Sequence, residues 1–184
     1  MASAVVTAAS RFELPVAGAD HEWRDAAKAL LASQRERVRA DFSAGVDIQK
    51  LLGNWCAAID AVVVSAWQRS FAAAGLSSGE LSLLATGGYG RGELYPLSDI
   101  DLLVLADSRA QKRAEPALAK FWALLWDAGL AAGHAVRSVP QCLDAARGEI
   151  QVLTSMLELR TLAGDDHVGF THGNFEKLFG TKAK

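Results

Sequence analysis

Two aspartates, Asp99 and Asp101, stand at the start of an apolar segment that continues to Leu105. Ten residues separate Asp99 from the paired glycines of a glycine-rich turn, 87–92. The apolar run 81–86 before this turn has turn residues on both sides, as a buried strand does. Because side chains alternate along a strand, the two carboxylates are predicted to share one face. The carboxylates and the backbone amides of the turn should therefore meet at one point.

Nucleotidyl transfer needs this combination of groups. Mg²⁺ prefers hard oxygen ligands and is usually held by one or two carboxylates together with substrate phosphates. Two ions about 3.5–4 Å apart can activate an attacking hydroxyl and neutralise a pyrophosphate leaving group. Asp99 and Asp101 are therefore predicted to be the catalytic residues and the metal ligands of a magnesium-dependent site.

The glycine-rich turn is predicted to hold the phosphates of a nucleotide. Free backbone amides at a strand end can bind phosphate oxygens, and a guanidinium beside them can bind two oxygens at once. For Arg91 an ion pair with Glu93 or another carboxylate is the competing interpretation. The predicted nucleotide-binding residues are Gly87, Gly88, Arg91 and Ser98.

Neither half of this pattern is specific alone. Carboxylates at strand ends often cap turns, and glycine-rich turns are common in loops. The combination in a strand, turn and strand context is much more specific. No Gly-Lys-Ser/Thr follows the glycines, which excludes a P-loop, and the spacing of Gly88, Gly90 and Gly92 differs from the dinucleotide-binding fingerprint.

At these residues the chain resembles a known family. Gly-Gly followed after ten residues by Asp-x-Asp is similar to the signature of the DNA polymerase β-like nucleotidyltransferase superfamily. The string GGYGRGELYPLSDIDLLVL resembles the N-terminal domain of bifunctional [protein-PII] uridylyltransferase/uridylyl-removing enzymes, and the resemblance covers roughly residues 40–165. Downstream matches are 126–130, 133–138 and 154–165. Glutamine synthetase adenylyltransferases, with a Gly-Lys-Leu turn, and the nucleotidyltransferases attached to CBS domains, with Gly-Ser-Glu-Gly-Arg, fit less well.

The resemblance implies an α+β fold: a small mixed β-sheet flanked by helices, the polymerase β-like nucleotidyltransferase fold, here with an N-terminal helical extension. A short helix after the first strand would hold the triphosphate. The implied reaction is transfer of UMP from UTP to a tyrosine of the nitrogen-regulatory protein PII, with Mg²⁺. PII and UTP are thus the expected partners, and nucleic acid and membranes are not.

The chain departs from the superfamily pattern in two places. Many members have Ser where this chain has Gly88, so backbone amides would have to replace a side-chain contact with phosphate. Members also supply a third carboxylate from a neighbouring strand, but the predicted strand 134–139 has none. Glu149 and Glu158 are the remaining acidic residues considered for this role. Glu158 is preferred because it lies in the family-like 156–160 stretch, although an Arg partner or simple exposure is the competing interpretation.

The family's enzymes are several times longer and add an HD phosphohydrolase domain and two ACT sensor domains. This chain has no His-Asp dipeptide, so uridylyl removal and glutamine sensing are expected to be absent. Its polar end, 180–184, is compatible with a truncation point or with a native end.

Composition narrows the function classes. The net charge is −2, from 19 basic and 21 acidic residues, so the chain lacks the excess of positive charge that is typical of proteins that bind DNA or RNA. Cys56 and Cys142 form no Cys-x-x-Cys pattern, which argues against a zinc site or a disulfide framework. No secretory signal pattern or 18-residue apolar span is present, so a cytoplasmic enzyme is expected.

Apolar spacing predicts the elements that must position the site. We expect residues 1–18 to form a flexible tail, 19–76 a helical extension, 77–165 the nucleotidyltransferase core and 166–184 a C-terminal segment or truncation point. Trp122 and Trp126 are predicted to be core residues. The predicted helices are 20–42, 47–74, 110–130, 140–148 and 150–163, and the predicted strands are 81–86, 99–105 and 134–139.

Two alternatives to a uridylyltransferase remain open at this stage. One is a non-catalytic nucleotide-binding or interaction module that keeps the fold but lacks the third carboxylate. The other is a nucleotidyltransferase that uses ATP or a small-molecule acceptor. No motif in the chain visibly addresses the edge of the uracil base.

Overall fold

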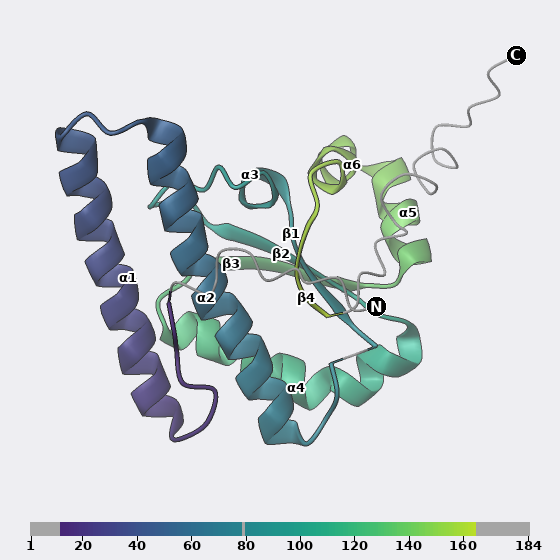
Figure 1. Cartoon of the computed structure of the whole chain (residues 1–184). Helices are drawn as coiled ribbons and strands as arrows, with labels where there is room; N and C mark the ends of the chain where they lie inside the picture. The colour runs from purple at the N-terminus through teal and green to yellow at the C-terminus, as the bar shows by residue number, and fades with distance from the viewer. Residues whose placement is uncertain (1–11, 79, 165–184) are drawn as a thin grey trace, which may run out of the picture.

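A four-stranded mixed sheet, in the order β3-β2-β1-β4, lies between two groups of helices (Figure 1). The computed structural model describes residues 12–78 and 80–164. β1 pairs antiparallel with β2 and with β4, and β2 pairs parallel with β3. The predicted α+β class with a small mixed sheet is confirmed. The strands are β1 (Ser82–Ala85), β2 (Ile100–Leu105), β3 (Ala132–Arg137) and β4 (Arg160–Gly164).

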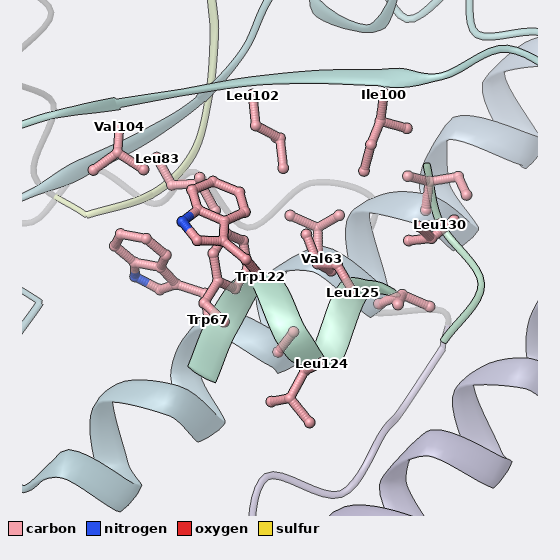
Figure 2. Close-up of a cluster of buried hydrophobic side chains, with 14 of the residues drawn as sticks. Val63, Trp67, Leu83, Ile100, Leu102, Val104, Trp122, Leu124, Leu125 and Leu130 are labelled. Atoms are coloured by element: carbon pink, nitrogen blue, oxygen red, sulfur yellow. The ribbon is translucent and has the colours of Figure 1, made fainter. Parts of the chain in front are cut away.

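Of the three long helices, α2 (Ile48–Ala74) and α4 (Ser108–Asp127) cover one face of the sheet, and α1 (Asp20–Ser43) packs on the outer side of α2. Two shorter helices, α5 (Val139–Gly148) and α6 (Ile150–Met156), cover the other face of the sheet. Along β2, Ile100, Leu102 and Val104 pack against the long helices, as Figure 2 shows for the α4 side. Leu103 and Leu105 pack against α5 and α6. The inward faces predicted for Ile100 and Leu102 are therefore confirmed, whereas the shared face predicted for Asp99 and Asp101 stays a prediction, because Asp99 precedes the strand.

Local sequence explains where the long helices begin and end. The carboxylate of Asp47 accepts hydrogen bonds from the amides of Gln49 and Lys50, so it caps the first turn of α2. Gly75, with φ +62°, ends the same helix in the left-handed conformation that favours glycine. Asp107 caps α4 in the same way as Asp47 caps α2.

Two sequence predictions are wrong. The predicted helix 150–163 ends at Met156, and Arg160–Gly164 form β4 instead. Pairing with the second edge of β1 decides this, because tertiary contacts outweigh the weak helix propensity of a short segment. Trp122 is buried as predicted, whereas Trp126 is 57% exposed, because only one side of α4 packs against the sheet and α2.

The described part of the predicted tail contacts the helices. The buried guanidinium of Arg69, on α2, donates to the carboxylate of Asp20 and to the carbonyl oxygens of Val16 and Gly18. Lys120, on α4, pairs with the same Asp20 carboxylate at 2.9 Å. Residues 1–11 of the predicted tail and the predicted segment 166–184 lie outside the described residues. Within the described residues, no helix is long and apolar enough to cross a membrane.

Candidate active site

The two predicted metal ligands lie at the beginning of β2. Asp101 is the second residue of the strand, and Asp99 lies in the turn just before it. Partial burial raises the pKa of the Asp101 carboxyl, and the negative charge of Asp99 raises it further. No Lys or Arg of the described chain offsets these effects at Asp101. The carboxylates are thus close enough to repel, which is the charge arrangement that a divalent cation relieves.

The glycine-rich turn lies against the Asp101 carboxylate. β1 ends at Ala85, and the four-residue helix α3 (Gly87–Gly90) follows, as the resemblance implied. The amide of Thr86 donates to the carbonyl oxygen of Asp101 at 3.0 Å, which ties the turn to β2. Gly87 has φ +56°, and a Cβ atom placed on it would lie 3.9 Å from Asp101 Oδ2.

The amides of Gly87 and Gly88 belong to the first turn of α3, where N–H groups have no acceptor within the helix. A Cβ atom on Gly88 would meet the carbonyl oxygen of Glu93 at 3.6 Å, an ordinary contact. The protein alone would therefore tolerate the Ser that many superfamily members have at this position. A Cβ atom on Gly90, by contrast, would collide with the carbonyl oxygen of Glu158.

The other two predicted nucleotide-binding residues are exposed. Arg91 donates to Glu93 Oε2 at 2.7 Å and also pairs with the carboxylate of Glu158. The structure thus contains the competing ion pair that the sequence left open, and binding of phosphate by Arg91 stays a prediction. Ser98 precedes Asp99 in the same turn, and its amide donates to the carbonyl oxygen of Tyr95 at 3.0 Å. Its role in nucleotide binding also stays a prediction.

A cavity of about 390 Å³ opens on the α5 and α6 side of the sheet, and Asp101 lies in its wall. Glu149, at the junction of α5 and α6, lies in the wall of the same cavity. Glu158, which the sequence favoured over Glu149, is paired with Arg91 instead. Within the described residues, no group of three or more His, Cys, Asp or Glu side chains is arranged to hold a metal. Metal binding here would therefore need substrate oxygens in addition to the two aspartates.

A buried polar network joins the glycine-rich turn to α2 and β4. The sequence did not reveal this network. The hydroxyl of Tyr89, in α3, donates to Asp60 Oδ1 at 2.7 Å. Arg160 Nη1 donates to Asp60 Oδ2 at 2.7 Å, and Arg160 Nη2 donates to Asp60 Oδ1 and to the carbonyl oxygen of Tyr89. Burial, followed by the charge of Asp60, raises the pKa of Tyr89 well above its ordinary value. An Asp among the apolar residues of α2 was the one available signal.

Gly133, on β3, is a second residue that sequence reasoning missed. It pairs with Asp101 across the parallel strands, and a Cβ atom on it would lie 2.6 Å from Asp101 Oδ1. The absence of a side chain at Gly133 therefore leaves the space that the carboxylate occupies.

We expect Gly133→Ala to displace the Asp101 carboxylate and to weaken magnesium-dependent nucleotide binding by about tenfold, since a misplaced ligand loses part of its metal contact. Calorimetric titration of UTP with Mg²⁺ measures this effect. Gly148→Ala is the control, because a Cβ atom there meets nothing within 4 Å. Unchanged UTP affinity in a folded Gly133→Ala protein would contradict this role.

Comparison with known proteins identifies a domain family and relatives of known name. The family described as "Nucleotidyltransferase domain" matches residues 74–142. The chain is 46% identical over 157 residues to a "Bifunctional uridylyltransferase/uridylyl-removing enzyme" of Xanthomonas oryzae pv. oryzae (strain MAFF 311018), which covers 85% of this chain and 17% of the relative. A protein of the same name from Ectopseudomonas mendocina (strain ymp) is 41% identical over 141 residues, or 77% of this chain and 15% of the relative. The chain thus spans less than a fifth of the length of these relatives.

Proposed function

Because the chain contains a nucleotidyltransferase domain and belongs to the family of the bifunctional uridylyltransferase/uridylyl-removing enzymes, we propose that it transfers UMP from UTP to a tyrosine of PII. The observation that carries the proposal is the closeness of the Asp101 carboxylate to the turn at Gly87, where a Cβ atom would lie 3.9 Å from Asp101 Oδ2, with Asp99 near enough to raise the pKa of Asp101. This arrangement combines anionic metal ligands with free backbone amides at one strand end, as nucleotidyl transfer requires.

The residues present fit Mg²⁺. Asp99 and Asp101 offer oxygen ligands only, and no Lys or Arg among the described residues offsets their repulsion at Asp101. Bound there, Mg²⁺ would neutralise charge on the triphosphate and lower the pKa of the attacking hydroxyl. The need for additional oxygen ligands agrees with a metal that binds together with the nucleotide.

The protein groups then have separate tasks. The amides of Gly87 and Gly88 would hold phosphate oxygens, and Asp99 and Asp101 would hold the metal. In the reaction, the acceptor oxygen forms a bond to the α-phosphorus, the bond from that phosphorus to the bridging oxygen breaks, and pyrophosphate leaves. We assign Glu149 to receive the proton of the acceptor hydroxyl, because it shares the cavity of Asp101.

Label transfer tests the proposal against both alternatives. The chain would be incubated with PII, Mg²⁺ and UTP labelled at the α- or the γ-phosphate, and then with ATP, CTP and GTP labelled at the α-phosphate. We expect PII to acquire label from α-labelled UTP and none from γ-labelled UTP. Nucleotide binding without transfer would favour the non-catalytic module, and preferential labelling from ATP would favour a different nucleotidyltransferase.

Glu149→Gln should lower the turnover number by about 10²–10⁴, since a general base contributes about that much, while UTP affinity stays unchanged. Glu158→Gln removes a carboxylate whose partner is the exposed Arg91, so it should retain most of the activity. Steady-state rates of UMP transfer, together with UTP affinity, measure both effects. Full turnover by the Glu149→Gln protein would contradict this assignment.

A further inference from the structure

A second cavity, of about 170 Å³, lies on the Asp99 side of the site. Its walls come from α1, from α2, from the turn that contains Ser98 and Asp99, and from the loop between α4 and β3. Both α1 and the part of α2 that it includes lie outside residues 74–142, which match the nucleotidyltransferase domain. The lining residues on which the inference depends are Arg35, Trp55, Ser98 and Asp99.

Arg35, on α1, has a guanidinium group that lies over an aromatic ring. Its guanidinium carbon lies 5.6 Å from the centre of the Trp55 ring, a cation–π distance, and no ion pair of Arg35 is found among the described residues. The next two arginines of the same helix differ, because Arg37 lies 3.8 Å from Asp41 and Arg39 lies 3.0 Å from Glu36. Arg35 is thus a cation held in place by an aromatic ring and available to an anion.

Ser98 is a further polar residue of this cavity. Trp55 is 2% exposed, so it forms a buried aromatic wall beside the Arg35 guanidinium. The hydroxyl of Ser98 can donate as well. The proposed function assigns Asp99 to the metal, and Arg35 and Ser98 offer donors to a ligand with several acceptor oxygens.

We infer that this Arg35–Trp55 cavity binds the phosphate oxygens of the nucleotide that leave as pyrophosphate. The inference rests on the proposed function, which assigns the metal to Asp99, in the wall of this cavity, and to Asp101, in the wall of the larger cavity. The larger cavity has the volume for a nucleoside and an acceptor side chain together with Glu149. The smaller one has the volume and the donors for phosphate groups, and Arg binds phosphate oxygens in pairs. The helical extension would therefore take part in substrate binding.

Calorimetric titration of the whole chain with pyrophosphate, UTP and UMP, each with Mg²⁺, tests the inference. Arg35→Gln should weaken pyrophosphate and UTP binding by about tenfold or more, which is the usual effect of losing a charge-assisted hydrogen bond, and should leave UMP binding unchanged. Trp55→Phe keeps an aromatic ring beside the guanidinium but weakens the cation–π contact that positions it, so it should weaken pyrophosphate binding by a smaller factor, about threefold. Arg39→Gln, on the same helix, is the matched control and should change none of the three affinities.

Two results would overturn the inference. Unchanged pyrophosphate affinity in the Arg35→Gln protein would show that the guanidinium does not contact phosphate. An equal loss of UTP and UMP affinity would show that this cavity holds the nucleoside, or that Arg35 acts only by offsetting the charge of Asp99. Neither readout depends on an acceptor: if pyrophosphate binding requires Arg35 but no UMP reaches PII, the proposed function fails and the inference stands.

Discussion

Asp101→Asn and Asp99→Asn are each expected to lower the rate of UMP transfer by about a thousandfold or more. Each substitution keeps the shape of the side chain and removes a charged metal ligand, and metal-ion catalysis contributes several kcal/mol to lowering the barrier. The free energy of unfolding should change by no more than about 1 kcal/mol, because neither side chain belongs to the hydrophobic core. Asp101→Asn is expected to stabilise the protein without metal, since it removes the repulsion from Asp99.

Transfer rates and thermal unfolding of the same preparations measure both effects. Asp144→Asn is a suitable control, because Asp144 is an exposed carboxylate that pairs with Arg147 on α5. That variant should transfer UMP at the unmodified rate. Wild-type rates in both Asp99→Asn and Asp101→Asn would contradict the assignment of metal ligands.

Arg160→Met is expected to destabilise the fold by about 3 kcal/mol. The substitution leaves the buried Asp60 carboxylate without its cation, and breaking a buried ion pair usually costs roughly 3–5 kcal/mol. We place the effect at the low end because the Arg160 side chain is one-third exposed. Since Arg160 also contacts the carbonyl oxygen of Tyr89, the glycine-rich turn should lose part of its support and UTP affinity should fall.

Urea unfolding of the Arg160→Met protein measures the loss of stability. Tyr89→Phe is a milder change in the same network, because it removes one hydrogen bond to Asp60 and leaves the ion pair intact. It should lower the free energy of unfolding by about 1 kcal/mol. An Arg160→Met protein as stable as the unmodified chain would show that the network does not hold the turn.

Local patterns were sufficient to predict the elements that position the site. The boundaries of α1 and α2, and the inward faces of Ile100 and Leu102 on β2, follow from helix and strand periodicity with capping residues. The failures occurred where partners far apart in the chain decide the structure. β4 exists because it pairs with β1, and the short segment 160–164 shows no such partner in its own sequence.

The same reason explains the site residues that were missed. Asp60 and Arg160 are separated by 100 positions, so neither position in the sequence identifies the other. Gly133 is informative only once its strand is known to pair with Asp101. The choice between Glu149 and Glu158 likewise depends on the fold, because it places Glu149 in the Asp101 cavity and brings Glu158 to Arg91.

The most direct test of the central claim is the intact mass of PII after incubation with the chain, UTP and Mg²⁺. Fragmentation of the product would then locate the modified side chain. We predict that PII gains the mass of one UMP per subunit on a tyrosine, that chelation of the metal prevents the gain, and that the Asp101→Asn protein produces none within the same time. A PII mass that stays unchanged with the unmodified chain, or that rises equally with the Asp101→Asn protein, would contradict the claim that Asp99 and Asp101 catalyse uridylyl transfer.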